Sequence, residues 1–320
     1  MREASVVGLL RLGRRVPFDL GVSLCCGQVF RWELRGVWWY GVVEGKVWKV
    51  RQVDDALEYE NAEEKRVWEY FGLEDDLPRI LEEIGKDRFA KKAIEGFRGL
   101  RILRQEPWEC LISYICATYK GIPAIKRMLD QLSMRVGEKI MLEGREFYTF
   151  PTVERLAKAS MSTLTDCGLG YRAKYVKETA NSVRKHAIDL GSLRGMRYKE
   201  ARNELLKLPG VGPKVADCVL LFSLGKTEAF PVDVWMRRVI VRHYGKHFPE
   251  EFLRKISEEK SLSTPEYARL SLFGRDYFGK YAGYAQEYLY HCERMYRNRH
   301  RNVMPLTPRL DDPERGKRLN

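Results

Sequence analysis

Two residues, Lys214 and Asp233, have the side-chain types and the surroundings that amine nucleophile chemistry needs. Lys214 stands in LPGVGPKVADC, where a glycine turn and a proline precede it and an apolar run follows it. At the start of a buried helix, the helix dipole and partial burial both oppose the positive charge of a lysine and increase the share of free amine. This position therefore favours Lys214 as a nucleophile.

Asp233 is the candidate partner of this lysine. It follows Lys214 by 19 residues, in FPVDVWMRRVI, at the predicted start of another helix. A carboxylate near a reacting amine can take up a proton or stabilise a developing positive charge. The alternative is that Asp233 only caps its helix. The two segments together, at this separation, are more specific than either segment alone.

The glycine turn before the lysine comprises Gly210, Val211 and Gly212, between helices that we predict at about 197–207 and 213–224. The turn does not match a dinucleotide fingerprint, because no strand precedes it and the third glycine is missing, and it does not match the phosphate loop G-x-x-x-x-G-K-[ST]. Free amides at the start of the second helix could hold a DNA phosphate without reading sequence. A plain helix–helix turn is the alternative.

The pattern along the chain changes from strand-like to helix-like near residue 60. Before that point, VWWYGVVEGKVWKVRQV predicts a hairpin around Glu44 and Gly45, and GQVFRWEL predicts another strand. After it, apolar residues recur every three or four positions. We expect helices in AEEKRVWEYFG, DLPRILEEIGKDRFAKKAIEGF and PWECLISYICATY, and at about 122–136, 152–159, 172–189, 197–207, 213–224, 232–244, 264–278 and 281–298.

This arrangement predicts two folded domains and a tail. We expect an N-terminal sheet domain over residues 1–95 and a helical domain over residues 96–300, in which the glycine turn and its flanking helices occupy about 205–225. A basic tail interrupted by prolines follows over residues 301–320. Strands and helices do not alternate along the chain, which argues against a doubly wound sheet.

Charge and cysteine content restrict the class of protein. The net charge of +13 and the pI near 9.3 favour a polyanionic partner, with nucleic acid the usual one, although a basic enzyme without such a partner is the alternative. The seven cysteines are scattered and form no C-x-x-C pair, so they match neither a zinc site nor a disulfide framework. They fit a reducing, intracellular compartment. No apolar run approaches the ~20 residues of a membrane span.

Together these segments resemble the helix-hairpin-helix DNA glycosylases that carry a Gly/Pro-rich stretch and an aspartate, and within them the 8-oxoguanine DNA glycosylase/lyases. The resemblance runs from about residue 20 to 291 and includes GQVFRWEL, WECLISYICAT, GLGYRAKYV, LPGVGPKVADC, FPVDVWMRRV and YAGYAQEYLY. It implies an α+β fold, in which a TATA-binding-protein-like antiparallel β-sheet domain precedes a mainly α-helical HhH-GPD glycosylase domain with two subdomains. No four-cysteine cluster follows, which argues against the iron–sulfur branches.

The resemblance also implies a reaction. By this likeness Lys214 attacks the sugar C1′ of a nucleotide flipped out of the duplex, displaces 8-oxoguanine and forms a Schiff base. The iminium then promotes β-elimination and strand nicking. Asp233, kept ionised, stabilises the oxocarbenium-like sugar and orients or deprotonates the amine. This chemistry needs no metal and no redox cofactor.

A base pocket follows from the same resemblance. The carbonyl of Gly27 would accept the N7–H that 8-oxoguanine has and guanine lacks, Cys218 and Tyr290 would cover the two faces of the base, and Gln286 would read its Watson–Crick edge. Pro231 belongs to the same pocket. Taken without the resemblance, Gly27 fits a strand bulge, and Cys218 and Tyr290 fit an ordinary core.

The remaining candidates contact DNA, and two of them depart from the family pattern. Tyr171 matches the family's intercalating wedge, and Arg172 matches an arginine that contacts the orphaned cytosine; solvated side chains at a helix start are the alternative. Tyr119 falls where the family has asparagines, one of which fills the gap left by the flipped base. The second cytosine-reading arginine aligns with Ala124, so we expect a weaker preference for cytosine opposite the lesion. Trp235 replaces a phosphate-binding histidine.

The expected partner is therefore duplex DNA containing 8-oxoguanine, bound by a monomer with no membrane contact, in the cytoplasm or nucleoid of a prokaryote or the nucleus of a eukaryote. A helix-hairpin-helix glycosylase for another damaged base remains open, and so does a non-catalytic DNA-binding protein whose lysine only contacts phosphate. For Asp217, in the second helix of the hairpin, we expect a structural hydrogen bond.

Overall fold

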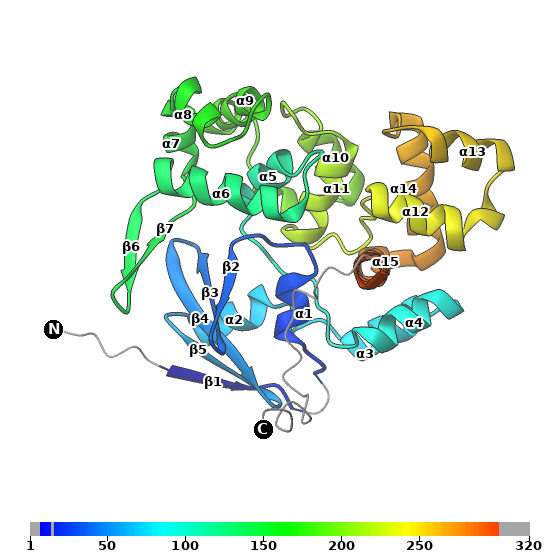
Figure 1. Cartoon of the computed structure of the whole chain (residues 1–320), viewed down its shortest axis with the longest axis horizontal. Helices are drawn as coiled ribbons and strands as arrows, with labels where there is room; N and C mark the ends of the chain where they lie inside the picture. Colours follow the sequence, from blue (N-terminus) through cyan, green and yellow to red (C-terminus); the bar gives the residue numbers. More distant parts are fainter. Residues whose placement is uncertain (1–6, 14–15, 301–320) are drawn as a thin grey trace, which may run out of the picture.

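The structure is a computed structural model that describes residues 7–13 and 16–300. An antiparallel sheet lies beside a larger helical part (Figure 1). The five strands follow the spatial order β1-β5-β4-β3-β2, and every neighbouring pair is antiparallel. They are β1 (Val7–Arg11), β2 (Trp32–Arg35), β3 (Trp38–Val43), β4 (Lys46–Val53) and β5 (Ala56–Glu60). The predicted α+β fold is confirmed, whereas the predicted basic tail over residues 301–320 lies outside the described residues.

The predicted hairpin joins β3 to β4 through Glu44 and Gly45. These two residues have φ values of 50° and 78°, and a two-residue type I′ turn needs a positive φ at both positions. On the sheet, Trp48 and Leu57 pack into one cluster with residues at the end of α2 (Glu64–Tyr70). The sheet therefore has its own apolar core.

The rest of the described chain is mainly helical. They are α1 (Leu20–Cys25), α3 (Leu77–Ile84), α4 (Arg88–Gly96), α5 (Pro107–Cys116), α6 (Ile122–Val136), α7 (Val153–Lys158), α8 (Met161–Asp166), α9 (Arg172–Arg184), α10 (Tyr198–Leu205), α11 (Pro213–Phe222), α12 (Val234–His243), α13 (Glu250–Glu258), α14 (Thr264–Phe278) and α15 (Ala282–His300). The bounds of α6 and α14 are those predicted, but α1, α8 and α13 were not expected. The expected single helix over 76–97 is two helices, because Asp87 accepts hydrogen bonds from the amides of Phe89 and Ala90 and so starts α4. Only the end of GQVFRWEL is strand, as β2.

A second hairpin, not expected from the sequence, extends from the helical part onto the sheet. Its strands are β6 (Lys139–Leu142) and β7 (Arg145–Tyr148). The turn residue Glu143 accepts a hydrogen bond from Lys49 Nζ on β4 at 2.7 Å and one from Tyr40 Oη on β3 at 3.2 Å. This hairpin therefore ties the helical part to the sheet. We propose that the domain boundaries lie near residues 95 and 300.

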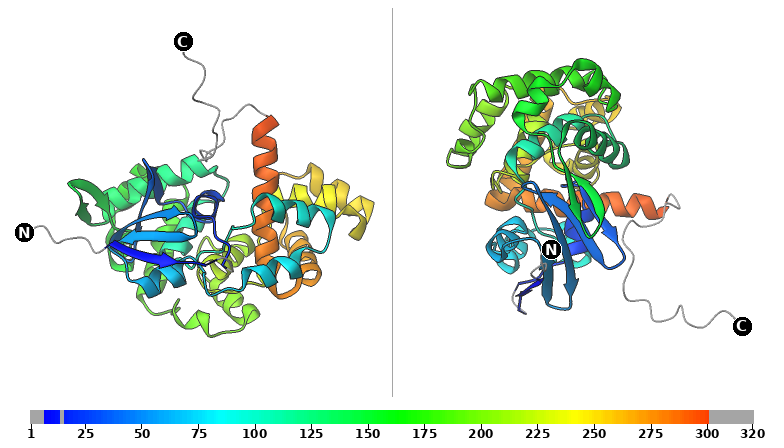
Figure 2. Two further views of the ribbon diagram at one scale, coloured as in Figure 1. Left: turned by 90° about the horizontal axis from the view of Figure 1, so that it is seen from below. Right: turned by 90° about the vertical axis from the view of Figure 1, so that its left-hand side faces the viewer.

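Helix α15 runs through the middle of the molecule, seen end-on in Figure 1 and lengthwise in the left view of Figure 2. It packs against α3 and α4 on one side and against α12 and α14 on the other. Segments far apart in the sequence therefore meet at this helix. None of the helices in the described part of the chain combines the length and the apolar character that crossing a membrane requires.

Candidate active site

A cleft of about 840 Å³ opens where α5, α6, α11, α12 and α15 converge. Most of the residues predicted to act line this one cleft: Gly27, Tyr119, Gly210, Gly212, Lys214, Cys218, Pro231, Asp233, Trp235, Gln286 and Tyr290. Val211, Tyr171 and Arg172 do not line it. Apart from GLGYRAKYV, the dispersed sequence segments on which the prediction rested thus meet at a single concave surface.

Lys214 enters the cleft from the first turn of α11. Gly212 is the N-cap of this helix and Pro213 its first residue. The preceding turn needs glycine at position 210, because its φ is +77° and a Cβ there would lie 2.6 Å from the Cβ of Tyr175 on α9. Among the described residues, no group forms a hydrogen bond or an ion pair with the Lys214 amine. The amine is therefore available for reaction.

Asp233 is the N-cap of α12 and also faces the cleft. Its Oδ1 accepts hydrogen bonds from the amides of Trp235 at 2.9 Å and Met236 at 2.8 Å. These amides and the helix dipole stabilise the negative charge of the carboxylate. The capping role considered from the sequence is therefore real, but it uses only Oδ1. No described residue donates a hydrogen bond to Oδ2, so this oxygen remains free for a second role.

Two uncharged side chains form walls of the cleft near Lys214. Cys218 follows Lys214 by one helical turn, and burial raises the pKa of its thiol, while the charge of Lys214 acts in the opposite direction. Burial likewise raises the pKa of the Tyr290 phenol. Both groups are neutral at neutral pH. A flat, uncharged ligand can therefore be held between them without an ionic contact to either.

Gly27 lies in a bend after α1, and its backbone is fixed by its neighbour. Its φ is +111°, and a Cβ would lie 3.0 Å from Arg294 Nη1 and 3.2 Å from Tyr290 Oη. The fully buried Gln28 donates from Nε2 to the carbonyl of Arg101 at 2.8 Å, and its Oε1 accepts from the amide of Leu103 at 2.8 Å. The bulge expected as the alternative for Gly27 is absent, because this stretch is not a strand in the described structure.

Asp217 makes the structural hydrogen bonds expected for it, inside the protein. The side chain is fully buried, and its Oδ1 accepts from Tyr198 Oη at 2.8 Å and from Arg202 Nε at 2.9 Å. Its Oδ2 accepts from Tyr267 Oη at 2.6 Å. Burial raises the pKa of this carboxyl, whereas the Arg202 charge and the hydrogen bonds oppose the rise. Asp217 thus connects α10, α11 and α14.

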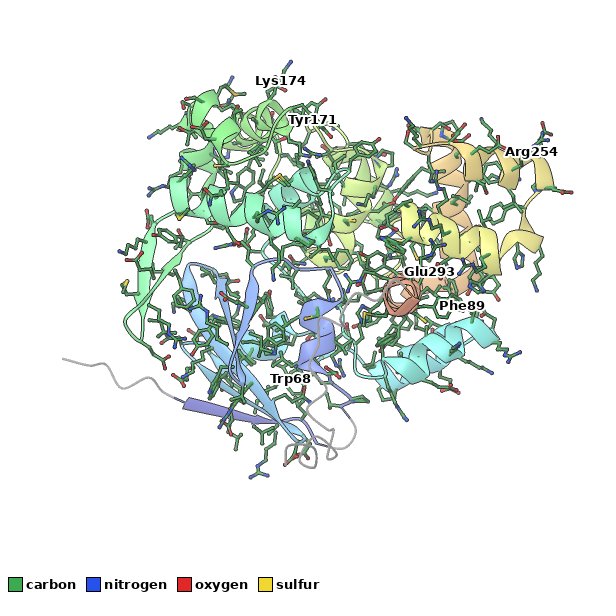
Figure 3. All side chains as sticks on the ribbon, viewed as in Figure 1. Trp68, Phe89, Tyr171, Lys174, Arg254 and Glu293 are labelled. Carbon is green, nitrogen blue, oxygen red and sulfur yellow. The ribbon has the colours of Figure 1, made fainter. Side chains whose placement is uncertain are left out.

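The two predicted DNA contacts outside the cleft differ in exposure. Tyr171 precedes α9, is 57% exposed and lies at the outer edge of the molecule (Figure 3). Arg172 is only 3% exposed, and its guanidinium donates to the carbonyl oxygens of Thr118 and Leu169. A contact between Arg172 and the base opposite a lesion remains a prediction, and it requires the loss of these bonds.

Two charged residues of the cleft, Glu287 and Arg294, were missed. Both are buried on α15, on the face that carries Tyr290. Burial raises the pKa of the Glu287 carboxyl to about 7. Arg294 donates from Nη2 to the carbonyl of Cys25 at 2.5 Å, and its Nη1 is buried without a partner. The available signal was a pair of charged residues seven positions apart, which places both on one face of the helix.

Trp235, at the position of the expected histidine, is half-buried, and the Arg238 guanidinium lies 5.2 Å from its ring centroid. Within residues 7–13 and 16–300, no group of three or more His, Cys, Asp or Glu side chains is placed to hold a metal ion. The chemistry that this cleft can perform with its own residues is attack by an amine, with a carboxylate in the same cleft.

Two segments of the chain match known protein families. Residues 12–111 match the family described as 8-oxoguanine DNA glycosylase, N-terminal domain. Residues 122–260 match the HhH-GPD superfamily of base excision DNA repair proteins. The first match covers β2 to β5 and the first half of α5, and the second includes the glycine turn, Lys214 and Asp233.

Individual relatives match over most of their length. The chain is 32% identical to the N-glycosylase/DNA lyase OGG1 of Arabidopsis thaliana, over 86% of this chain and 77% of that protein. It is 34% identical to the N-glycosylase/DNA lyase of Saccharomyces cerevisiae, over 73% of this chain and 67% of that protein. The 8-oxoguanine glycosylase/lyase of Clostridium acetobutylicum, solved with duplex DNA containing cytosine opposite 8-oxoguanine, superposes with a TM-score of 0.80 at 32% identity, over 92% of this chain and 97% of that chain.

Proposed function

Because the chain belongs to the 8-oxoguanine DNA glycosylases of the HhH-GPD superfamily, we propose that Lys214 excises 8-oxoguanine from duplex DNA and that strand nicking follows. The chain is a DNA N-glycosylase and DNA lyase of base excision repair. The observation that carries the proposal for its chemistry is that a lysine amine without a partner and a carboxylate with one free oxygen open into the same cleft.

The proposed reaction proceeds in two stages. Lys214 Nζ forms a bond to the sugar C1′, the C1′–N9 bond breaks, and its electron pair leaves with the base. The free Oδ2 of Asp233 stabilises the positive charge on the sugar and takes up the proton that the amine loses. Ring opening of the sugar then gives an iminium between Lys214 and C1′. Loss of a C2′ proton expels the 3′ phosphate and nicks the strand.

The proposed base site uses the neutral walls and the acceptors of the cleft. The flipped base would lie between Cys218 and Tyr290, near Pro231, with its N7–H directed to the carbonyl of Gly27. Gln286 is buried and its Oε1 has no partner, which suits the N–H groups on the Watson–Crick edge of a guanine-type base. A buried acceptor left unpaired by the wrong base disfavours that base.

The proposed DNA contacts lie partly in the cleft and partly outside it. The turn of Gly210, Val211 and Gly212 would hold a phosphate with the first amides of α11, and Tyr171, Tyr119 and Trp235 would contact the duplex around the lesion. The net charge of +13 supports binding to a polyanion. We further propose that the protein acts as a monomer, without metal or redox cofactor, wherever chromosomal DNA lies.

We also propose a weak preference for cytosine opposite the lesion. Ala124 has no donor with which to read a base edge, and the Arg172 donors are engaged by carbonyl oxygens. Position 124 therefore offers no guanidinium to the orphaned cytosine, and the proposed contact from Arg172 requires the loss of its bonds to Thr118 and Leu169. Comparable excision opposite cytosine and adenine supports this part of the proposal, and a strong preference for cytosine contradicts it.

Borohydride trapping tests the chemistry. Reduction during turnover should link the protein covalently to DNA containing 8-oxoguanine, and Lys214→Gln should abolish the link while much of the affinity remains. Absence of a trapped species with the unaltered protein contradicts the Schiff-base mechanism and favours a non-catalytic DNA-binding protein. Trapping on another damaged base, without trapping on 8-oxoguanine, favours a different lesion.

A further inference from the structure

Arg294 on α15 is a buried arginine in which only one of the two terminal nitrogens has a partner. Its Nη2 donates to the carbonyl oxygen of Cys25 at 2.5 Å and to His291 Nδ1 at 3.2 Å. Its Nη1 is buried and has no hydrogen-bond partner among the described residues. Arg294 also forms no ion pair with any carboxylate in that part of the chain. A buried donor left unpaired costs free energy, so a ligand that accepts from Nη1 binds with an advantage.

His291 helps to fix the guanidinium in place. Arginine has no acceptor atom, so His291 Nδ1 accepts in this contact and the hydrogen of the neutral ring is on Nε2. Burial lowers the pKa of His291 to about 3, which keeps the ring neutral at neutral pH, and the ring forms a hydrogen bond with the backbone of Cys26. Arg294 and His291 thus bind two consecutive residues, Cys25 and Cys26, and the position of Nη1 is set before any ligand enters.

The unpaired nitrogen lies beside Gly27, the next residue of the same segment. A Cβ at position 27 would lie 3.0 Å from Arg294 Nη1 and 3.2 Å from Tyr290 Oη, so only glycine leaves this space open. Gly27 and Arg294 both line the cleft that Lys214 enters. A backbone carbonyl and a fixed N–H donor are therefore neighbours in the wall of this cleft.

The oxidised edge of 8-oxoguanine carries the complementary pair of groups. N7–H is a donor and O8 is an acceptor, on adjacent atoms of a cyclic amide. Guanine has an acceptor at N7 and a C–H group at C8, so it matches neither protein group. If N7–H is directed to the carbonyl of Gly27, the neighbouring O8 comes to the side where Arg294 lies.

We infer that Arg294 is a specificity-determining residue whose Nη1 donates a hydrogen bond to O8 of the damaged base. This inference rests on the proposed function and adds a second reading group to the base site. Gly27 and Arg294 together then recognise the amide edge of an oxidised purine, through one acceptor and one donor. Guanine in the cleft leaves the Nη1 donor unpaired, which disfavours the undamaged base.

The test compares Kd for three duplexes that differ only in the nucleotide opposite one cytosine, which is 8-oxoguanine, 8-thioguanine or a tetrahydrofuran abasic site. Every protein carries Lys214→Gln, so that no Schiff base forms. 8-Thioguanine keeps N7–H but has sulfur, a weaker acceptor, in place of O8. We expect Lys214→Gln to bind the 8-oxoguanine duplex at least about tenfold more tightly than the 8-thioguanine duplex. Equal affinities for these two duplexes overturn the inference.

Arg294→Met, added to Lys214→Gln, removes the donor and keeps an apolar side chain. We expect the preference for 8-oxoguanine over 8-thioguanine to fall below about threefold, while Kd for the abasic duplex changes by less than about twofold. If Arg294 only fixes the segment before Gly27, both bases lose the same factor, because both present N7–H. An unchanged preference, or an equal loss on all three duplexes, therefore contradicts a bond to O8.

Arg297→Met is the matched control on the same helix. Arg297 is half-buried, donates to Glu293 at 3.0 Å and does not line the cleft, so its loss should leave the preference within about twofold. Thermal unfolding checks each variant. If Arg294→Met does not fold, Arg294→Lys takes its place, since a single ammonium nitrogen cannot occupy the positions of both Nη1 and Nη2. This variant should lower the preference at least about threefold, and an unchanged preference again refutes the inference.

The outcome is separable from the proposed chemistry. The affinities are measured without Lys214, whereas borohydride trapping requires it. If trapping fails while Arg294→Met lowers the preference for 8-oxoguanine over 8-thioguanine, the proposed reaction is wrong and the role of Arg294 stands. If trapping succeeds while the preference is unchanged, the reaction stands and the role of Arg294 is wrong.

Discussion

The Tyr267 Oη donates a hydrogen bond to Asp217 Oδ2 at 2.6 Å, and the same hydroxyl lies 3.4 Å from the amide nitrogen of Val232. Asp217 is on the helix that carries Lys214, and Val232 directly precedes Asp233. A buried carboxylate therefore connects the two segments that carry the proposed catalytic pair. This connection gives Asp217 a role in stability that can be measured apart from the reaction.

Asp217→Ala should lower the free energy of unfolding by about 3–5 kcal/mol, because it leaves Arg202 and the hydroxyls of Tyr198, Tyr267 and Ser271 without their partner. Chemical denaturation measures the change. The control is Glu204→Ala on α10, which breaks a largely exposed ion pair with Lys207 and should cost at most about 1 kcal/mol. Equal losses in the two variants would show that the buried network adds nothing beyond a surface pair.

Asp233→Asn should separate the two roles of this residue. Asparagine also caps helices, so the free energy of unfolding should change by less than about 1 kcal/mol. The single-turnover rate of 8-oxoguanine excision should fall by about 10²–10⁴, because the amide cannot take up a proton or stabilise positive charge. Asp76→Asn, which alters the cap of α3, is the control and should leave the rate unchanged. A rate equal to that of the unaltered protein would leave Asp233 with its capping role only.

Gly27→Ala should impair recognition of the damaged base more than the lyase reaction. The new methyl group would meet Arg294 Nη1 at 3.0 Å in a backbone conformation with a φ of +111°. We expect excision of 8-oxoguanine to fall at least about tenfold, while nicking of a preformed abasic site is retained. Gly36→Ala is the control, since its φ is +61° but a Cβ there meets nothing. A parallel loss of both activities would indicate general damage to the fold.

Glu287→Gln should alter the pH dependence of stability. Burial raises the pKa of Glu287 to about 7, above its ordinary value of 4.5, because the folded protein favours the neutral carboxyl over the carboxylate. The stability that the fold has with this neutral carboxyl is fully present below pH 4.5 and is lost as pH rises through 7. Removing the ionisable group should raise the free energy of unfolding at pH 8 by up to about 3 kcal/mol and change it little at about pH 4.5. Chemical denaturation at the two pH values checks this sign. An equal change at both values would mean that ionisation of Glu287 is not responsible.

Ala124→Arg should introduce a preference for cytosine. The residue lies in the first turn of α6, next to the cleft-lining Pro123 and Ile125. A guanidinium there can reach a base edge that alanine cannot, and one specific contact discriminates by about 1–3 kcal/mol. The ratio of excision rates opposite cytosine and adenine should therefore rise about tenfold. Ala124→Met, which adds length without donors, should leave the ratio unchanged.

The local sequence predicted the helix starts that carry Lys214 and Asp233. The glycines and proline of LPGVGPK fix the backbone conformation of that segment, and the proline and aspartate of FPVDVW do the same for theirs. The positions of Lys214 and Asp233 at helix starts therefore followed from a few adjacent residues. The hairpin at Glu44 and Gly45 followed in the same way. The same dipeptide at Glu143 and Gly144 was overlooked, although both residues again have positive φ.

Features set by distant contacts were less accessible. The burial of Arg172 was not predicted, because nothing near it in the sequence reveals that the carbonyl of Thr118 lies within reach. The buried charges of Glu287 and Arg294 depend on how α15 crosses the segment before β2. The short helices α8 and α13 lack long apolar periodicity, and they are stabilised by packing that the sequence pattern does not show.

The burial of Cys218 affects how readily its thiol is oxidised. Oxidants attack the thiolate form of cysteine, and burial keeps this residue as a thiol by raising its pKa. 8-Oxoguanine is itself a product of guanine oxidation, so the protein has to work where such oxidants are present. A sulfur atom that lines this cleft and stays in the thiol form is a poor target for conversion to a sulfenic acid under the chemical conditions that generate the proposed substrate.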